Sequence, residues 1–273
     1  MAEQREVKAT YLPLFIISGV AFMALAAAFY LAFFAAAAPT ADASARSARD
    51  DANRAAAAAG LDPKQRSAME AIVRDYILQN PEIITDAVTI LRQRDTLRKL
   101  ESVKAEVTAP FPGAVLGNPD GDVTLIEFSD YACGYCRASL NDVRKLISED
   151  KGLRIVVREL PILSEESGEA ARWALAAAKQ GKYAAFHDAM YAAGRPGKIS
   201  IDAAARKAGL DIDAARSFAA GDAAKAEVAR NIQFAQTLGF GGTPSWIVGD
   251  QLLEGAVGYD ALKKAIAAAR AKN

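Results

Sequence analysis

Cysteine and histidine are scarce in this chain of 273 residues, and each scarcity excludes a class of site. There are two cysteines and one histidine, His187. Two cysteines allow at most one intramolecular disulfide, which excludes a scaffold stapled by several disulfides. One histidine excludes multi-histidine metal sites and argues against a Cys–His nucleophile pair. We therefore predict no metal site.

The chain also lacks net charge. Lysine and arginine together number 33, as do aspartate and glutamate, so the formal charge is zero. A protein that binds nucleic acid normally carries a basic footprint, and we expect no nucleic-acid partner. The length is sufficient to bury a sizeable hydrophobic core.

Charged side chains are missing altogether from residues 11–38, YLPLFIISGVAFMALAAAFYLAFFAAAA. The apolar region of a cleaved signal peptide has only about 7 to 15 residues, so this run predicts an uncleaved transmembrane anchor behind a cytoplasmic tail at 1–10. Small residues at 41–43 leave cleavage, and hence a secreted periplasmic form, as the alternative. Basic residues occur on both sides of the run, so the positive-inside rule does not orient it.

Two segments of different composition follow the predicted anchor. An Ala-rich linker, mobile or weakly helical, is predicted at 39–60, where large apolar residues are missing. A helical extension is predicted at 61–108, with a break at Asn80-Pro81. One apolar stripe at helical spacing marks its first helix: Met69, Ile72, Val73, Tyr76 and Ile77. The apolar repeat then drifts, so the pattern leaves open a solvated connector and an oligomerisation stalk.

A Pro- and Gly-rich stretch at 109–122 marks the start of the last predicted domain, 109–273. The pattern then predicts a strand at 123–128, a helix at 133–148 and a second strand at 153–160. A helical block at about 164–238, a hairpin at 245–257 and a final helix at 259–271 follow. This order indicates an α/β core with a helical insertion.

The two cysteines stand three residues apart in Cys133-Gly134-Tyr135-Cys136. Buried structural thiols, a zinc site shared by two chains and a weakly stabilising disulfide are the other interpretations. A redox pair is favoured because Cys133 follows a strand and starts a helix, where free N–H groups and the helix dipole stabilise a thiolate. Cys136, one turn further on, can then attack a mixed disulfide. Gly134 leaves the first thiol accessible, and Tyr135 is expected at the substrate surface.

Three other conspicuous residues are interpreted as structural. His187 is expected to pack or face solvent on a helix, and Arg137 to occupy a solvated helix position. Trp246 is expected in the core.

Residues 115–271 resemble the DsbA-like thiol-disulfide oxidoreductases of the bacterial envelope. The motifs that carry the resemblance are LGNPDGDVTLIEFSDYACGYC and GGTPSWIVGDQLLEGAVG. The resemblance implies a thioredoxin fold with an inserted helical domain and no cofactor. It also implies that Cys133 is the nucleophile, Cys136 the resolving cysteine and Pro244 a cis-proline, and that Glu127 relays the proton of the second cysteine.

The chain departs from the strongly oxidising members, which place Pro-His between their cysteines. Here Gly134-Tyr135 stands there, and Thr243 precedes the cis-proline, a combination associated with DsbC-type disulfide isomerases. The resemblance therefore favours an isomerase that binds substrate through Gly134, Tyr135, Thr243 and Pro244. A DsbA-type dithiol oxidase and a Cu(I)-binding envelope protein are the alternatives.

Residues 67–95 resemble the N-terminal extension of the ScsC-like branch, whose members use it to assemble, so a homo-oligomer is expected. The family also implies unfolded or misoxidised envelope proteins as clients. A membrane redox partner is implied too, either a DsbD-like reductant or a DsbB-like oxidant. Because disulfide exchange is useful in an oxidising compartment, we expect the catalytic domain on the periplasmic side of the inner membrane.

Overall fold

The computed structural model describes residues 41–272. The predicted cytoplasmic tail at 1–10 and the predicted anchor at 11–38 lie outside the described residues. Between residues 41 and 272, no helix combines the length and the apolar character that crossing a bilayer requires. The chain divides into two compact units, with the boundary between Thr85 and Asp86.

The described part of the first unit, residues 41–85, is helical. The Ala-rich segment forms α2 (Ala41–Ala58), in keeping with the high helix propensity of alanine, and α3 (Pro63–Gln79) follows it. Asp62 starts α3 with a capping box: its side chain accepts the N–H groups of Lys64 and Gln65, and its own N–H donates to the Gln65 side chain. None of the residues of α3 is buried.

The helix α4 (Glu82–Thr108) carries the chain into the second unit. Most of its apolar side chains are exposed, but Leu100 and Val107 near its end are buried. They join a core cluster with residues of the sheet. The end of α4, which precedes the domain start predicted at residue 109, therefore packs against the sheet.

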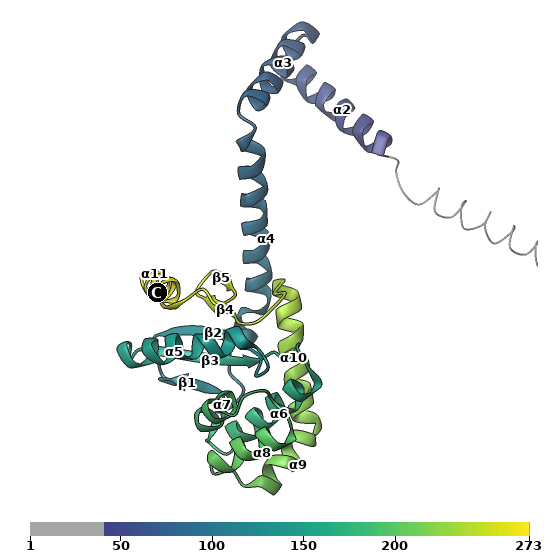
Figure 1. Cartoon of the computed structure of the whole chain (residues 1–273). Coiled ribbons are helices and arrows are strands. Elements are labelled where there is room, and N and C mark those ends of the chain that lie inside the picture. Colours follow the sequence, from purple (N-terminus) through teal and green to yellow (C-terminus); the bar gives the residue numbers. More distant parts are fainter. Residues whose placement is uncertain (1–40, 273) are drawn as a thin grey trace, which may run out of the picture. The chain divides into compact units, whose positions relative to one another are not determined.

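The second unit is built on a five-stranded sheet in the order β1-β3-β2-β4-β5 (Figure 1). The strands are β1 (Val115–Gly117), β2 (Val123–Ser129), β3 (Leu153–Glu159), β4 (Ser245–Val248) and β5 (Gln251–Glu254). Strands β2 and β3 are parallel, and the other pairs are antiparallel. The sequence prediction missed the short β1, and it extended the last strand beyond Glu254.

Helices pack on both faces of the sheet because the central strands are apolar on both sides. On one face, side chains such as Leu125, Ile155 and Val157 pack with α5 (Gly134–Glu149) and α11 (Tyr259–Arg270). On the other face, Ile126 and Val156 pack with the end of α4 and with α10 (Asp222–Leu238). The predicted insertion comprises α10 and four shorter helices: α6 (Glu165–Lys179), α7 (Tyr183–Ala192), α8 (Lys198–Lys207) and α9 (Ile212–Ala220).

One buried arginine joins α4, the sheet and the insertion. Arg158 of β3 donates to the carbonyl oxygens of Glu106, Val107 and Ala109, which lie at the end of α4. Its Nη1 also donates to Glu227 of α10 at 2.9 Å. The guanidinium thereby satisfies carbonyl groups that a helix leaves unpaired at its C-terminus.

Candidate active site

The cysteine pair lies where β2 passes into α5. Cys133 is the N-cap of α5, and its Sγ accepts a hydrogen bond from the N–H of Cys136 at 3.4 Å. The first sulfur therefore lies at the N-terminus of the helix, as the sequence predicted, where backbone N–H groups and the helix dipole favour negative charge. Cys133 exposes 5% of its surface and Cys136 none, so only the first thiol reaches the surface.

A distant segment meets the first cysteine. The Thr243–Pro244 peptide bond is cis, as predicted from the resemblance. The Cys133 Sγ donates to the carbonyl oxygen of Thr243 at 3.2 Å. The Tyr135 side chain is 71% exposed next to the pair, as expected, and Gly134 has open space around its Cα. The four predicted substrate-binding residues are thus gathered around the Cys133 sulfur, together with Cys136.

Glu127 of β2 is buried, exposing 1% of its surface. Burial raises the pKa of its carboxyl to about 7, although a hydrogen bond from Ser129 opposes the shift. Its Oε2 has no hydrogen-bond partner among the residues that the structure describes. Burial likewise raises the pKa of the Cys136 thiol to about 12, and the charge of Glu127 adds to that rise. The two groups therefore interact, which the proposed proton relay requires.

Asp130 organises the loop that leads to Cys133, a role that the sequence analysis missed. Its Oδ1 accepts the N–H of Ala132, and its Oδ2 accepts the N–H groups of Ile162 and Leu163. Its carbonyl oxygen accepts the N–H of Cys133 at 3.0 Å. This one residue fixes the loop after β3 against the turn that positions the nucleophile.

A buried polar cluster of Glu159, Tyr131, Tyr183 and His187 lies on the side of the insertion and was also missed. The Glu159 Oε1 accepts hydrogen bonds from the hydroxyls of Tyr131 and Tyr183, at 3.1 and 2.7 Å. The Tyr131 hydroxyl lies 3.2 Å from His187 Nδ1. Burial raises the pKa of Glu159, while the hydrogen bonds from Tyr183 and Tyr131 oppose that rise. Burial lowers the pKa of His187 to about 4, so the imidazole is neutral.

The sequence carried a signal for this cluster. Tyr183, His187 and Tyr191 recur every four residues and share one face of α7. All three side chains are buried, which excludes the solvent-facing position considered for His187. The predicted core position of Trp246 is confirmed, since this side chain is fully buried.

The prediction for Arg137 was wrong. Its guanidinium donates to the carbonyl oxygens of Tyr191 and Gly194, at 2.5 and 2.7 Å, rather than extending into solvent. These carbonyls lie at the end of α7, where helix carbonyls need external donors. Arg137 thereby fastens α5 to the insertion.

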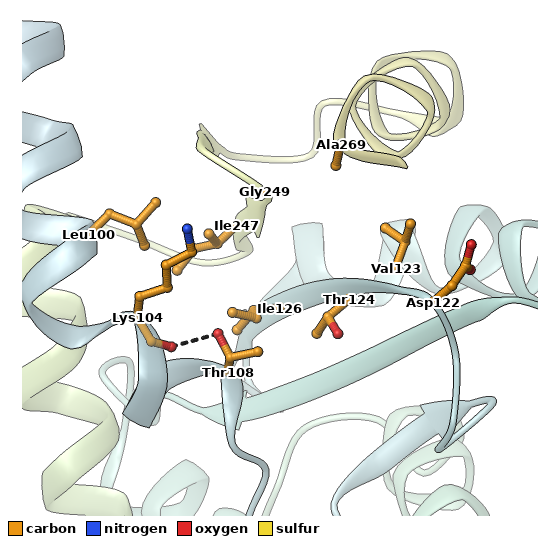
Figure 2. Close-up of a pocket in the computed structure, with 10 residues that line it drawn as sticks. All are labelled: Leu100, Lys104, Thr108, Asp122, Val123, Thr124, Ile126, Ile247, Gly249 and Ala269. Atoms are coloured by element: carbon orange, nitrogen blue, oxygen red, sulfur yellow. Dashed lines mark hydrogen bonds between the residues drawn. The ribbon is translucent and has the colours of Figure 1, made fainter. Parts of the chain in front are cut away.

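A separate cavity of about 180 Å³ lies on the face of the sheet that packs on α4 (Figure 2). Leu100, Ile126 and Ile247 give it an apolar wall, and Lys104 lies at its side. It contains none of the predicted site residues.

The raised pKa of Glu127 predicts a pH dependence of stability. The unfolded carboxyl loses its proton near pH 4.5 and the folded one near pH 7, so the folded state binds more protons between these values. As the pH rises through this range, the free energy of unfolding should therefore fall by about 3 kcal/mol relative to that of Glu127→Gln. Urea denaturation of both proteins at pH 4, 5.5 and 8 measures this; a difference that does not change with pH contradicts the buried carboxyl.

Comparison with known proteins supports the thioredoxin-like fold. Residues 124–267 match the DSBA-like thioredoxin domain, and residues 65–96 match the copper resistance protein ScsC N-terminal domain. Two curated relatives, the Na(+)/H(+) antiporters NhaA 1 of Salinispora arenicola and NhaA 3 of Salinispora tropica, are 29% and 30% identical over 158 and 160 residues. The match covers 57% of this chain but only 24% of each relative.

Solved structures resemble both parts. A thioredoxin-like oxidoreductase from Silicibacter pomeroyi is 44% identical, with a TM-score of 0.54, over 57% of this chain and 91% of that one. The thiol-disulfide exchange protein alpha-DsbA2 from Wolbachia pipientis is 30% identical, with a TM-score of 0.59, over 65% and 97%. A Proteus mirabilis ScsC variant, 24% identical with a TM-score of 0.64 over 78% and 98%, shares the fold. Since the first domain match spans more than half of its residues, this chain belongs to the family with a DSBA-like thioredoxin domain, in its ScsC-like branch.

Proposed function

We propose that the chain is a thiol-disulfide oxidoreductase that acts on proteins of the bacterial envelope. The observation that carries the proposal is the placement of the Cys133 sulfur. It caps α5, where a thiolate is stabilised, and it touches the Thr243 carbonyl next to the cis-proline. Its partner Cys136 is three residues away and fully enclosed.

In the proposed reaction, the Cys133 thiolate attacks a substrate disulfide, forms a mixed disulfide and releases one substrate thiolate. Cys136 then loses its proton to Glu127 and attacks Cys133, which releases the second substrate thiolate and leaves a Cys133–Cys136 disulfide. The substrate disulfide gains two electrons and the enzyme pair loses two. Run backwards, the same steps oxidise a substrate dithiol.

The substrate surface is proposed to include Gly134, Tyr135, Thr243 and Pro244. An extended, unfolded segment can pair with backbone groups whatever its sequence, and a redox protein with many clients needs that tolerance. The exposed Tyr135 ring adds an apolar contact beside the reacting sulfur.

The direction of the net reaction follows from the redox potential. The Gly-Tyr pair and Thr243 favour isomerisation, which needs a pair that stays reduced. A scrambled-disulfide refolding assay of the purified protein tests this, together with the equilibrium of Cys133–Cys136 against glutathione. Reactivation of the scrambled substrate supports the isomerase. Rapid oxidation of reduced substrate without reshuffling indicates the dithiol oxidase, and tight Cu(I) binding without either activity indicates the copper protein.

The location and the partners are part of the same proposal. The catalytic domain is proposed to be periplasmic, held by an anchor at 11–38 or released if that segment is cleaved. Its redox state would be set by a membrane partner, a DsbD-like reductant for an isomerase or a DsbB-like oxidant for an oxidase. Labelling of the single pair in intact cells with an impermeant thiol reagent tests the compartment.

Self-association is proposed to involve the apolar surface of α3. Met69, Ile72, Val73 and Tyr76 are each more than half exposed, which is unusual for a contiguous apolar stripe on a monomer. We predict that Val73→Glu lowers the mass measured by light scattering to that of one chain. Lys64→Glu, an exposed charge change on the same helix, should leave the mass unchanged. An unchanged mass for Val73→Glu would exclude α3 from the interface.

A further inference from the structure

A second buried carboxylate lies beside Glu127. Strands β2 and β3 are parallel, with Glu127 opposite Val157 and Ser129 opposite Glu159. Since side chains alternate between the faces of a sheet, Glu127 and Glu159 project from the same face in diagonal positions on neighbouring strands. Each exposes 1% of its surface.

The described part of the chain places no compensating cation against this pair. Among residues 41–272, neither carboxylate forms an ion pair with lysine or arginine. Arg158 precedes Glu159 but projects to the other face, where it binds Glu227. The groups that face Glu159 are the hydroxyls of Tyr131 and Tyr183 and the acids Asp130 and Glu127; His187 reaches it through Tyr131.

Two negative charges so close together in a dry region are unfavourable, and one charge is much easier to hold. The two carboxylates differ in what stabilises that charge. Two tyrosine hydroxyls donate to Glu159, whereas one oxygen of Glu127 has no hydrogen-bond partner within residues 41–272. Glu127 interacts with the Cys136 thiol. The single negative charge can therefore reside on Glu159, or it can reside on Glu127 when the Cys136 thiolate has taken the Glu127 proton.

We propose that one negative charge alternates between Glu127 and Glu159 in step with the redox state of Cys133–Cys136. This rests on the proposed thiol-disulfide function. When a substrate thiolate attacks Cys133, the disulfide breaks and Cys136 leaves as a thiolate with the electron pair of the bond. Cys136 takes the proton of Glu127, which becomes ionised, and Glu159 takes up a proton from solvent. Oxidation reverses each transfer, so Glu159 is a positioning residue that acts through Glu127.

The single histidine reports the state of Glu159. The Tyr131 hydroxyl has one proton and two acceptors within reach, Glu159 Oε1 and His187 Nδ1. An ionised Glu159 attracts that proton, which leaves His187 to donate from Nδ1. A protonated Glu159 releases it, and Tyr131 then donates to an unprotonated Nδ1. The imidazole tautomer should therefore differ between the oxidised and reduced proteins.

The proposal is tested by the equilibrium constant for reduction of the protein by glutathione between pH 6 and 9. If Glu159 takes up a proton on reduction, the equilibrium constant for reduction of the wild type falls as the pH rises. Relative to the constant of Glu159→Gln, it falls by up to about tenfold per pH unit. We expect the ratio of the Glu159→Gln constant to the wild-type constant to rise at least about threefold over this range. Glu101→Gln, the same change at an exposed position of α4, should give a constant ratio.

A ratio for Glu159→Gln that does not vary with pH overturns the proposal and leaves the proposed function intact. A wild-type protein without a reversible disulfide overturns both. Should Glu159→Gln fail to fold, the ring nitrogen NMR shifts of His187 in the wild type at pH 8 decide instead. The two nitrogens are expected to shift in opposite directions between the oxidised and reduced states, and identical spectra overturn the proposal.

Discussion

Replacing Cys133 by alanine is expected to reduce thiol-disulfide exchange to the background rate, a loss of several orders of magnitude. The reason is that Cys133 alone combines a place at the N-terminus of α5 with access to the surface. Exchange is measured by the reshuffling or oxidation of a model substrate, and folding is checked by circular dichroism. Retained activity would contradict the site.

The matched variant is Cys136→Ala, which keeps the nucleophile but removes the resolving thiol. This protein should still attack substrate and should accumulate as a mixed disulfide, because the second step is blocked. Non-reducing electrophoresis and mass spectrometry detect the adduct. If both single variants behave alike, with no adduct, the assigned order of attack is wrong.

Replacing Arg158 by methionine is expected to destabilise the second unit by about 3–5 kcal/mol. The change leaves the buried Glu227 carboxylate without its closest cation and removes the donors from three carbonyls at the end of α4. Denaturant unfolding measures the loss, which lowers the midpoint without altering the reacting sulfurs.

Arg230→Met is the control, since Arg230 lies 3.7 Å from the same Glu227 carboxylate but is more than half exposed. It should cost only about 0–1 kcal/mol. Arg158→Met combined with Glu227→Leu should recover part of the lost stability, because no buried charge is then left unpaired. Equal losses from Arg158→Met and Arg230→Met would show that burial of the pair is unimportant.

The sequence predicted the elements that depend on local pattern. The apolar run of β2, the helix that begins after Cys133 and the hairpin of β4 and β5 are each visible in short windows. The resemblance to the DsbA-like proteins then implied the thioredoxin fold and the cis-proline at Pro244. The cis bond and the burial of Glu127 agree with these expectations.

Features that depend on tertiary contacts were not predictable in this way. Arg137 was expected in solvent because a charged residue on a helix usually faces water, but the end of α7 supplies carbonyls for it. Glu159 ends a strand and looks like a surface acid until Tyr131 and Tyr183 are brought to it. The strand β1 has only three residues, too few for a periodic signal.

The anchoring of α4 has a practical consequence for work on the isolated catalytic part. A fragment cut at residue 109 would discard Leu100 and Val107 and would leave the Arg158 guanidinium without the carbonyl oxygens of Glu106 and Val107. A recombinant fragment that begins a few residues before Leu100 keeps these contacts while it omits α3. Such a fragment should express as a folded, soluble protein, whereas the shorter one should aggregate.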